Sequence, residues 1–187
     1  RALELAKIVQ KDARLVELVL EESIEVLRAI PHVLIVRHRL GHVMANAGID
    51  HSNVEGGEND RVLLLPLDPD ASATTLRERL RVALDCRLGV VITDSFGRPW
   101  RNGVVNVAIG SSGLPALIDR RGEQDMYGRT MQVTQVAFAD AIAAGAGLVM
   151  GEGAEGTPLV LVRGLHWRAP ECNTQSLIRP LHEDLFQ

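Results

Sequence analysis

Two nearly uninterrupted apolar runs separated by one helical segment constrain the fold of this chain most strongly. The runs RVLLLPL at 61–67 and LGVVI at 88–92 predict buried strands, and ATTLRERLRVAL at 73–84 predicts a helix between them. This strand–helix–strand order indicates a βαβ unit, in which polar residues that carry chemistry collect where the strands stop. Asp94 and Ser95 stand at such a position.

The remaining segments mix helices with short strands. Residues 4–29 repeat apolar side chains at three–four spacing, which predicts a helix broken near Asp12. Alternation over 32–48 predicts a β-hairpin. A strand that runs into an alanine-rich helix is expected over 131–151, with the helix ending at Gly145 or Gly151, and a last strand is expected over 157–165.

The composition narrows the function classes. With 187 residues, a net charge of -4 and 3% aromatic side chains, the chain has neither the basic field nor the stacking surfaces that nucleic acids need. No apolar run approaches the length of about eighteen residues that indicates a membrane span. Cys86 and Cys172 lack CxxC spacing and fit a reducing compartment. We therefore expect a cytoplasmic protein that binds neither nucleic acid nor membrane.

Both ends of the sequence carry expectations. Arg1 falls inside an amphipathic helical pattern without an initiator methionine or a cap, so we expect an N-terminal segment to be missing. Residues 166–187 contain Pro170 and Pro180, which predict an extended C-terminal arm over the surface or onto a partner. Residues 1–187 are expected to form a single domain.

The first candidate site is the acidic loop after the predicted hairpin. Its oxygen-bearing side chains are Asp50, Ser52, Asn53, Glu55, Glu58 and Asp60. Hard oxygen ligands of this kind bind Mg²⁺ or Mn²⁺, although the spacing is not that of an EF-hand. Taken alone, the segment is better explained as a solvated acidic loop with Asx turns.

A second candidate, TDSFGRPWRNG at 93–103, is the strongest local signal in the sequence. Asp94 can hold a metal, and Ser95 can add a hydroxyl ligand. Arg98 and Arg101 can clamp a phosphate or a carboxylate through paired hydrogen bonds. The alternative is a plain turn that contains an ion pair.

A third candidate is the glycine-bearing segment MGEGAEGTP at 150–158. Its glycines let backbone N–H groups approach an anion closely, and Glu152 is available to a metal. No GKS or GKT follows, so it is not a Walker A motif, and a simple helix-stop turn explains it as well. The segment DRRGEQDMYGRT at 119–130 is explained equally well as a charged loop and as a substrate clamp.

Six segments, taken together and in order, resemble the coenzyme F-420-0:gamma-glutamyl ligase family across nearly the full length of the chain. They are GIDHSNV, TDSFGRPWRNG, DRRGEQDMYGR, LVMGEGAEGTP, LVLVRG and RPLHEDLF. The resemblance implies an α+β fold of mixed and antiparallel sheets with flanking helices, assembled as an intertwined homodimer. It also implies GTP-dependent amide formation between L-glutamate and the deazaflavin coenzyme F-420-0.

The resemblance assigns roles to residues of this chain. It implies two divalent ions, Mg²⁺ or Mn²⁺, bound beside the co-substrate GTP, and K⁺ is a candidate for an additional ion. The implied metal ligands are Asp50, Asp94, Ser95 and Glu152. The implied nucleotide-binding residues are Asn53, Gly151, Glu152, Gly153, Ala154, Glu155, Gly156, Thr157 and Pro158. Arg98 and Arg101 are the expected catalytic clamps. Asn106 departs from the pattern, because the family often has aspartate there.

The expected reaction requires no nucleophilic side chain. The substrate carboxylate would attack the γ-phosphate of GTP to give an acyl phosphate, which the amine of glutamate then captures. Two alternatives stay open. A metal-dependent phosphohydrolase would turn over nucleotide without glutamate, and a non-catalytic module for cofactor binding or dimerisation would bind without turnover.

Overall fold

The computed structural model describes residues 1–52, 54 and 61–184, and the chain divides into two compact units. Unit 1 is Arg1–Leu65 with Phe96–Val104, and unit 2 is Pro66–Ser95 with Val105–Gln187. Small antiparallel sheets with flanking helices confirm the predicted α+β class. None of the described helices is long and apolar enough to cross a membrane. That residues 1–187 act as a single domain stays a prediction.

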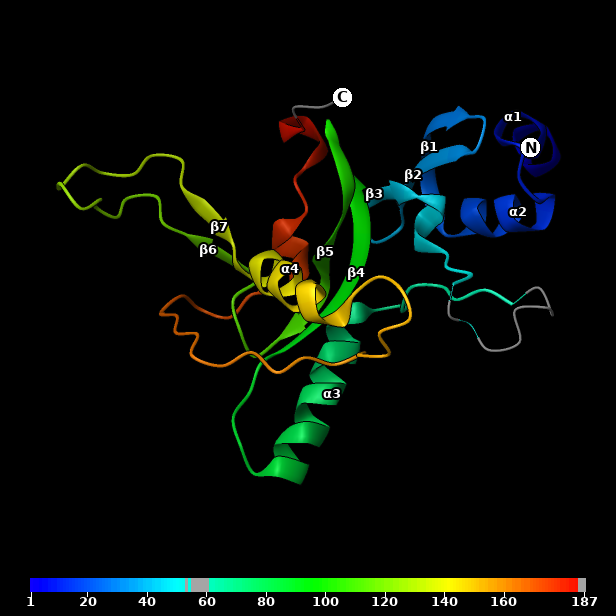
Figure 1. The fold of residues 1–187 in the computed structure, drawn as a ribbon. Helices are drawn as coiled ribbons and strands as arrows, with labels where there is room; N and C mark the ends of the chain where they lie inside the picture. The colour runs from blue at the N-terminus through cyan, green and yellow to red at the C-terminus, as the bar shows by residue number, and fades with distance from the viewer. Residues whose placement is uncertain (53, 55–60, 185–187) are drawn as a thin grey trace. The chain divides into compact units, whose positions relative to one another are not determined.

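Unit 1 packs two helices on a three-stranded antiparallel sheet (Figure 1). Its elements are α1 (Ala2–Val9), α2 (Ala13–Glu21), β1 (Ser23–Ile30), β2 (Val33–His38), β3 (Val43–Ala45) and the 3-10 turn η1 (Asn46–Gly48). Val16 and Val19 of α2 and Leu34 and Val36 of β2 are fully buried in one cluster. The amphipathic face of α2 therefore closes the core of this unit.

The first helical pattern is confirmed only in part. Asp12 caps α2, because its carboxylate accepts the Arg14 N–H at 2.8 Å, and the helix breaks where the sequence predicts. The prediction of helix as far as residue 29 is wrong, since 23–30 forms strand β1. Three–four spacing fits this segment too, but pairing with β2 satisfies its backbone and overrides the helical period.

A buried histidine ends strand β2. The His38 ring is fully buried; its Nδ1 accepts the Leu40 N–H at 3.0 Å, and its Nε2 lies 3.4 Å from Glu22 Oε2. Arg39 Nε contacts the same Glu22 oxygen at 3.0 Å. Burial, together with the positive charge of Arg39, lowers the pKa of His38, and the Glu22 carboxylate offsets part of that effect.

Acid is expected to destabilise the protein through His38. The unfolded histidine takes up a proton near pH 6.5, whereas the folded ring with its lowered pKa does so only at more acid pH. The free energy of unfolding should therefore fall as pH drops below about 6.5, by up to about 1.4 kcal/mol per pH unit. Urea unfolding at several pH values checks this.

His38→Asn keeps an acceptor near Leu40 but cannot titrate, so its stability should depend less on pH than that of the wild type. His182→Asn, at a side chain 80% exposed, is the matched control and should keep the wild-type slope. Equal slopes in His38→Asn and the wild type would show that His38 is not the titrating group.

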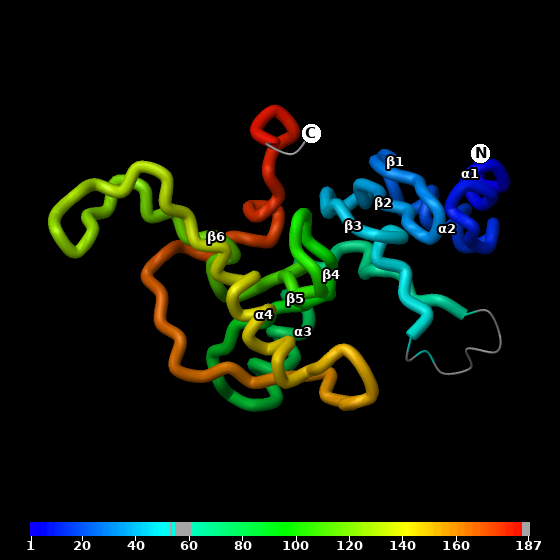
Figure 2. The backbone as a smooth tube through the Cα atoms, turned by 45° about the horizontal axis from the view of Figure 1, so that its top comes forward, coloured from blue at the N-terminus to red at the C-terminus, as the bar shows by residue number. Residues whose placement is uncertain are grey.

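Unit 2 joins helices to two two-stranded sheets. Its elements are α3 (Pro69–Leu84), β4 (Val90–Arg98), β5 (Arg101–Ser112), β6 (Leu117–Asp119), β7 (Gln135–Ala137), α4 (Phe138–Met150), η3 (Thr174–Leu177) and η4 (Leu181–Glu183). The β4–β5 hairpin contributes its tip to unit 1. Figure 2 shows the chain between β6 and β7 running out as a long arm. Ala108, Ala116 and Ala139 form the small core.

The predicted βαβ unit does not form. Within the described part of the chain, residues 61–67 make one bridge, between Leu63 and Asp50, and Leu67 is 82% exposed. Pro66 lacks a backbone donor, and the chain then enters α3, which is capped by Asp68 through the Ala71 N–H at 2.9 Å. Strand β4 pairs with the strand that follows it, β5. The sheet is thus built from a local hairpin and not from a crossover.

Of the other strand predictions, two are confirmed and one is wrong. The hairpin over 32–48 is confirmed by the antiparallel pair β2–β3, and the strand that enters an alanine-rich helix is confirmed by β7 and α4. The prediction of a last strand over 157–165 is wrong, because that segment forms an irregular connection and no strand. An apolar run forms a strand only where a partner strand accepts its backbone hydrogen bonds.

One carboxylate joins three segments of unit 2. Asp70 in the first turn of α3 accepts the Ser111 N–H of β5 at 2.8 Å and the Thr174 N–H at 3.2 Å on its Oδ1 atom. The Thr174 hydroxyl lies 3.0 Å from the same oxygen. Thr174 is 1% exposed, so its polar groups have little access to water; Asp70 accepts from its N–H, and its hydroxyl lies 3.0 Å from both Asp70 Oδ1 and the Ile109 carbonyl oxygen.

Candidate functional site

A hydroxyl and a carboxylate from distant parts of the chain meet in unit 2. Ser95 of β4 donates a hydrogen bond from Oγ to Glu152 Oε2 at 2.8 Å. Glu152 directly follows Gly151, the residue that ends α4. Strand β4 and the turn after α4 therefore bring together two of the four residues predicted to bind metal.

Asp94 precedes Ser95 on β4 and is half-buried. Because β4 continues to Arg98, the prediction that these two residues stand where a strand stops is wrong. The oxygens of Asp94, Ser95 and Glu152 are the hard donors that Mg²⁺ and Mn²⁺ prefer, so the donor set fits such an ion in its chemistry. Among residues 1–52, 54 and 61–184, no three Asp, Glu, His or Cys side chains gather in a metal-holding group. Binding of one ion by the whole predicted set stays a prediction.

Asp50 belongs to unit 1 and follows a tight left-handed turn. Asn46, Ala47 and Gly48 have φ values of 50°, 54° and 68°, an uncommon conformation for the first two residues. The Asp50 carboxylate accepts the Ser52 N–H at 2.7 Å, which confirms an Asx turn in this loop. Asn53, together with the acidic residues Glu55, Glu58 and Asp60, lies outside the described residues.

The two predicted clamp arginines flank the tip of the β4–β5 hairpin. Arg98 is half-buried, and its Nη1 atom is buried without a hydrogen-bond partner among the described residues. Arg101 is exposed. Between them Trp100 has a φ of 57°, which forms the turn. Because a buried donor without a partner is costly, Arg98 is the better placed of the two to accept an anion.

The glycine-rich segment after α4 forms an irregular, mostly exposed turn that includes Ala154 and Pro158. Glu155 folds back, and its Oε2 accepts the Gly153 N–H at 2.8 Å. Thr157 Oγ1 lies 3.4 Å from the Glu155 carbonyl oxygen. Gly151 and Gly156 have φ values of 72° and 61°, a region that favours glycine. The glycines of this segment predicted unusual backbone conformations. They did not predict that the Glu155 side chain accepts a hydrogen bond from the backbone of the same turn.

The charged segment 119–130 uses its acids locally. The Asp119 carboxylate pairs with Arg121, and hydrogen bonds from that residue lower the pKa of Asp119 to about 2. Asp125 accepts the backbone N–H groups of Tyr127 and Arg129 at 2.8 and 2.9 Å. Both aspartates therefore have partners within the segment itself. The charged-loop interpretation of this segment expects such local contacts.

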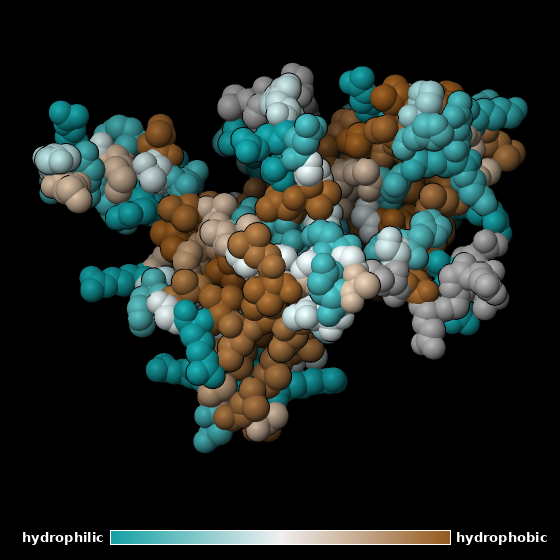
Figure 3. Space-filling view, in the orientation of Figure 1, coloured by the Kyte–Doolittle hydropathy of each residue, from teal (hydrophilic) through white to brown (hydrophobic). Residues whose placement is uncertain are grey.

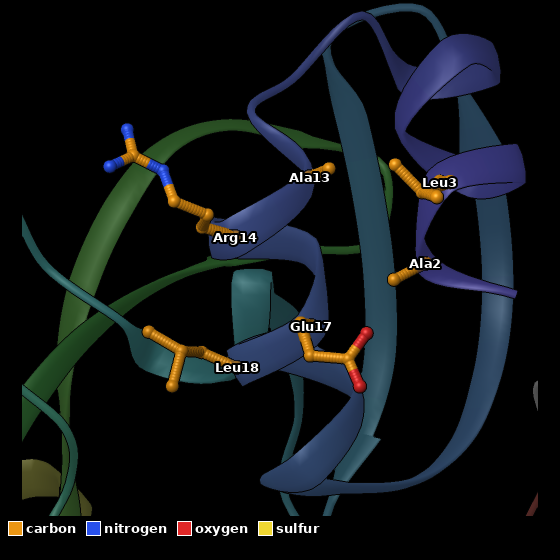
Figure 4. Close-up of a pocket in the computed structure, with 6 residues that line it drawn as sticks. All are labelled: Ala2, Leu3, Ala13, Arg14, Glu17 and Leu18. Atoms are coloured by element: carbon orange, nitrogen blue, oxygen red, sulfur yellow. The ribbon is translucent and has the colours of Figure 1, made fainter.

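An apolar pocket of about 480 Å³ lies in unit 1. Figure 4 shows its walls, which come from the start of α1 and from α2. They are formed by Ala2, Leu3, Ala13, Arg14, Glu17 and Leu18. Arg14 is held by Asp12 at 2.7 Å, so its charge is already paired. None of the predicted site residues that the structure describes lines this pocket.

Comparison with known families assigns the class of protein. A family model described as F420-0:Gamma-glutamyl ligase matches residues 1–164. That match covers most of the chain, so the chain belongs to the F420-0:gamma-glutamyl ligase family. The resemblance read from the six segments is confirmed.

Individual relatives agree with this assignment. Over nearly the whole chain it is 49% identical to the coenzyme F420:L-glutamate ligase of Archaeoglobus fulgidus and 46% identical to that of Methanopyrus kandleri. It is 42% identical to the ligase of the same name from Methanocaldococcus jannaschii. The matches span 98–100% of this chain and 73% of each relative. The chain is therefore similar to ligases throughout its length.

Proposed function

We propose that the protein joins the amine of L-glutamate to a carboxylate of the deazaflavin coenzyme F420-0 and converts GTP to GDP and phosphate. Family membership and the names of the relatives support the ligase activity and these two substrates. The main structural support for the proposed site is the contact between Ser95 and Glu152, because it joins residues that lie 57 positions apart in the chain. GTP as the phosphate donor rests on the resemblance.

The proposed reaction has two steps. A carboxylate oxygen of F420-0 attacks the γ-phosphorus of GTP, the bond to GDP breaks, and an acyl phosphate forms. The glutamate amine then attacks the acyl carbon, phosphate leaves, and the nitrogen loses a proton. Phosphoryl transfer of this kind depends on positioning and on charge neutralisation, so no side chain has to act as a nucleophile.

We assign the metal-binding role to Asp50, Asp94, Ser95 and Glu152. Two divalent ions, Mg²⁺ or Mn²⁺, would neutralise the triphosphate when bound, and K⁺ is a candidate for an additional, monovalent ion. Their hard oxygen ligands support this choice of ions. The Ser95 hydroxyl, which donates to Glu152, would have to turn its lone pairs toward an ion.

We assign nucleotide contacts to Asn53 and the segment 151–158, whose backbone N–H groups suit phosphate oxygens. Arg98 is proposed to hold a substrate carboxylate or the phosphodiester of F420-0, because its buried Nη1 lacks a partner among the described residues. Arg101, exposed across the same turn, is proposed as the second clamp.

The decisive assay measures phosphate release from GTP in the presence of Mg²⁺ or Mn²⁺, with and without L-glutamate and F420-0. The ligase proposal expects release that needs both co-substrates, and a product heavier by one glutamyl residue in mass spectrometry. Phosphate release that ignores glutamate would instead establish the phosphohydrolase. Nucleotide binding without turnover would establish the binding module.

We also propose that the protein acts as a homodimer built through unit 2. Figure 3 shows hydrophobic side chains gathered over the part of unit 2 that holds α3 and α4. Leu148, Leu159 and Leu161 are 89%, 76% and 69% exposed. Exposed apolar side chains in such numbers are typical of an interface, and a second copy of the chain is the partner that the family resemblance implies.

Aspartate at two of these positions is expected to break the dimer. In Leu159→Asp/Leu161→Asp, carboxylates would be buried without partners in the interface, which costs several kcal/mol and should shift the mass in solution to that of a monomer. Light scattering after size exclusion measures this mass. Leu3→Asp, at a leucine 70% exposed on α1, is the control and should stay dimeric. A dimeric double variant would remove this surface from the interface.

A further inference from the structure

The turn after α4 holds Glu152 from both sides. On one side the Gly151 N–H donates to the Gly147 carbonyl at 3.0 Å and ends the helix. On the other side the Gly153 N–H donates to Glu155 Oε2 at 2.8 Å. The residues on either side of Glu152 are thus fixed by hydrogen bonds, and the Glu152 side chain reaches Ser95 Oγ.

Gly151 is what makes room for the Glu155 carboxyl group. A Cβ atom on residue 151 would overlap that group, and the φ of 72° at this position is strained for any residue with a side chain. The Glu155 carboxylate therefore occupies the space that a side chain of residue 151 would fill. The position of the Glu155 carboxylate therefore requires a glycine at residue 151, four positions earlier.

We propose that Glu155 is a positioning residue, which holds the turn so that Glu152 stays directed at Ser95. This inference rests on the proposed metal-binding role of Glu152. It places the Glu155 side chain in the turn and leaves the backbone of residue 155 for the nucleotide contact proposed above. The Glu155 carboxylate acts on a backbone N–H, so an acceptor of the same reach is required, whereas its negative charge is not.

Two variants of Glu155 distinguish the loss of its charge from the loss of its acceptor oxygen. Glu155→Gln keeps an acceptor oxygen at the same distance along the side chain, and Glu155→Ala removes it. Glu171→Ala is the matched control, because the Glu171 carboxylate accepts a glycine N–H in the same way, from Gly113 at 2.6 Å. The control removes a similar contact that does not involve the turn around Glu152.

The first readout is amide hydrogen exchange at Gly153 in protein free of metal and nucleotide. Exchange should be roughly tenfold faster in Glu155→Ala than in the wild type, as expected for loss of one hydrogen bond, and close to the wild-type rate in Glu155→Gln. Unchanged exchange in Glu155→Ala would overturn the inference, because the contact would then not hold the turn.

The second readout is the affinity for Mn²⁺ alone, measured from the free Mn²⁺ signal in electron paramagnetic resonance. We expect Glu155→Ala to weaken binding several-fold, with Glu155→Gln and Glu171→Ala within about twofold of the wild type. Equal weakening in Glu155→Gln and Glu155→Ala would overturn the inference, since Glu155 would then act through its charge as a ligand.

These outcomes separate the inference from the ligase proposal. Wild-type protein that binds Mn²⁺ but forms no glutamylated product would contradict the ligase proposal, and the comparison of Glu155 variants would still decide the positioning role. Wild-type protein that binds no Mn²⁺ would overturn the proposed metal site and the inference that rests on it, whereas product formation would still decide the ligase proposal.

Discussion

Asp94→Asn is expected to lower kcat/KM for glutamylation of F420-0 by roughly a thousandfold, about 4 kcal/mol of transition-state stabilisation. Asparagine has nearly the shape of aspartate but lacks the negative charge that a divalent ion requires. Asp94 is half-buried on β4 directly before Ser95, whose hydroxyl contacts Glu152, so the charge is lost inside the proposed metal site. Product formation followed by mass spectrometry gives kcat and KM separately.

Asp85→Asn is the matched control for this variant. Asp85 ends α3 with a φ of 45°, a conformation that asparagine accepts readily, and the residue is exposed. The same chemical change there should leave kcat/KM within about twofold, because surface substitutions rarely alter the protein elsewhere. An Asp94→Asn enzyme with more than about a tenth of wild-type activity would exclude Asp94 from metal binding.

Gly110→Ala is expected to destabilise unit 2 by about 3 kcal/mol. A Cβ on residue 110 of β5 would overlap the carbonyl group of Pro69 and would lie 2.7 Å from the Pro69 Cβ. Because the main overlap is with backbone at the start of α3, no side-chain rotation can relieve it, and the helix or the strand must move. Urea unfolding monitored by circular dichroism measures the loss.

Gly145→Ala in α4 provides the opposite case. A Cβ on residue 145 meets nothing within 4 Å, and alanine is the better helix former, so this variant should gain up to about 1 kcal/mol. The two variants add the same methyl group and are expected to differ in sign. A Gly110→Ala protein as stable as the wild type would mean that α3 does not press on β5 as described.

The sequence predicted the fold class and several elements because their signals are local. The break at Asp12, the hairpin of β2 and β3, and the helix ending at Gly151 depend on capping and turn chemistry within a few residues. The failures all concern pairing. Segments 23–30, 61–67 and 157–165 have spacing that fits more than one structure, and distant partners decide between them.

The candidate site was likewise predicted only in part. The family resemblance placed Ser95 and Glu152 in one site, and the structure brings them into contact. The role of Glu155 in the turn was not visible, because a carboxylate folded onto a backbone N–H two residues earlier leaves no periodic signal. Nor could the sequence separate Arg98 from Arg101, which differ in burial and not in residue type.

The junction at Asp70 has a kinetic consequence. Its partners Ser111 and Thr174 lie 41 and 104 residues away along the chain, so the junction can form only after long stretches of chain have been ordered. Contacts made after the folding transition state leave the folding rate nearly unchanged and slow unfolding. The Asp70 carboxylate is therefore expected to govern the lifetime of folded unit 2 and to have little influence on how quickly that unit assembles.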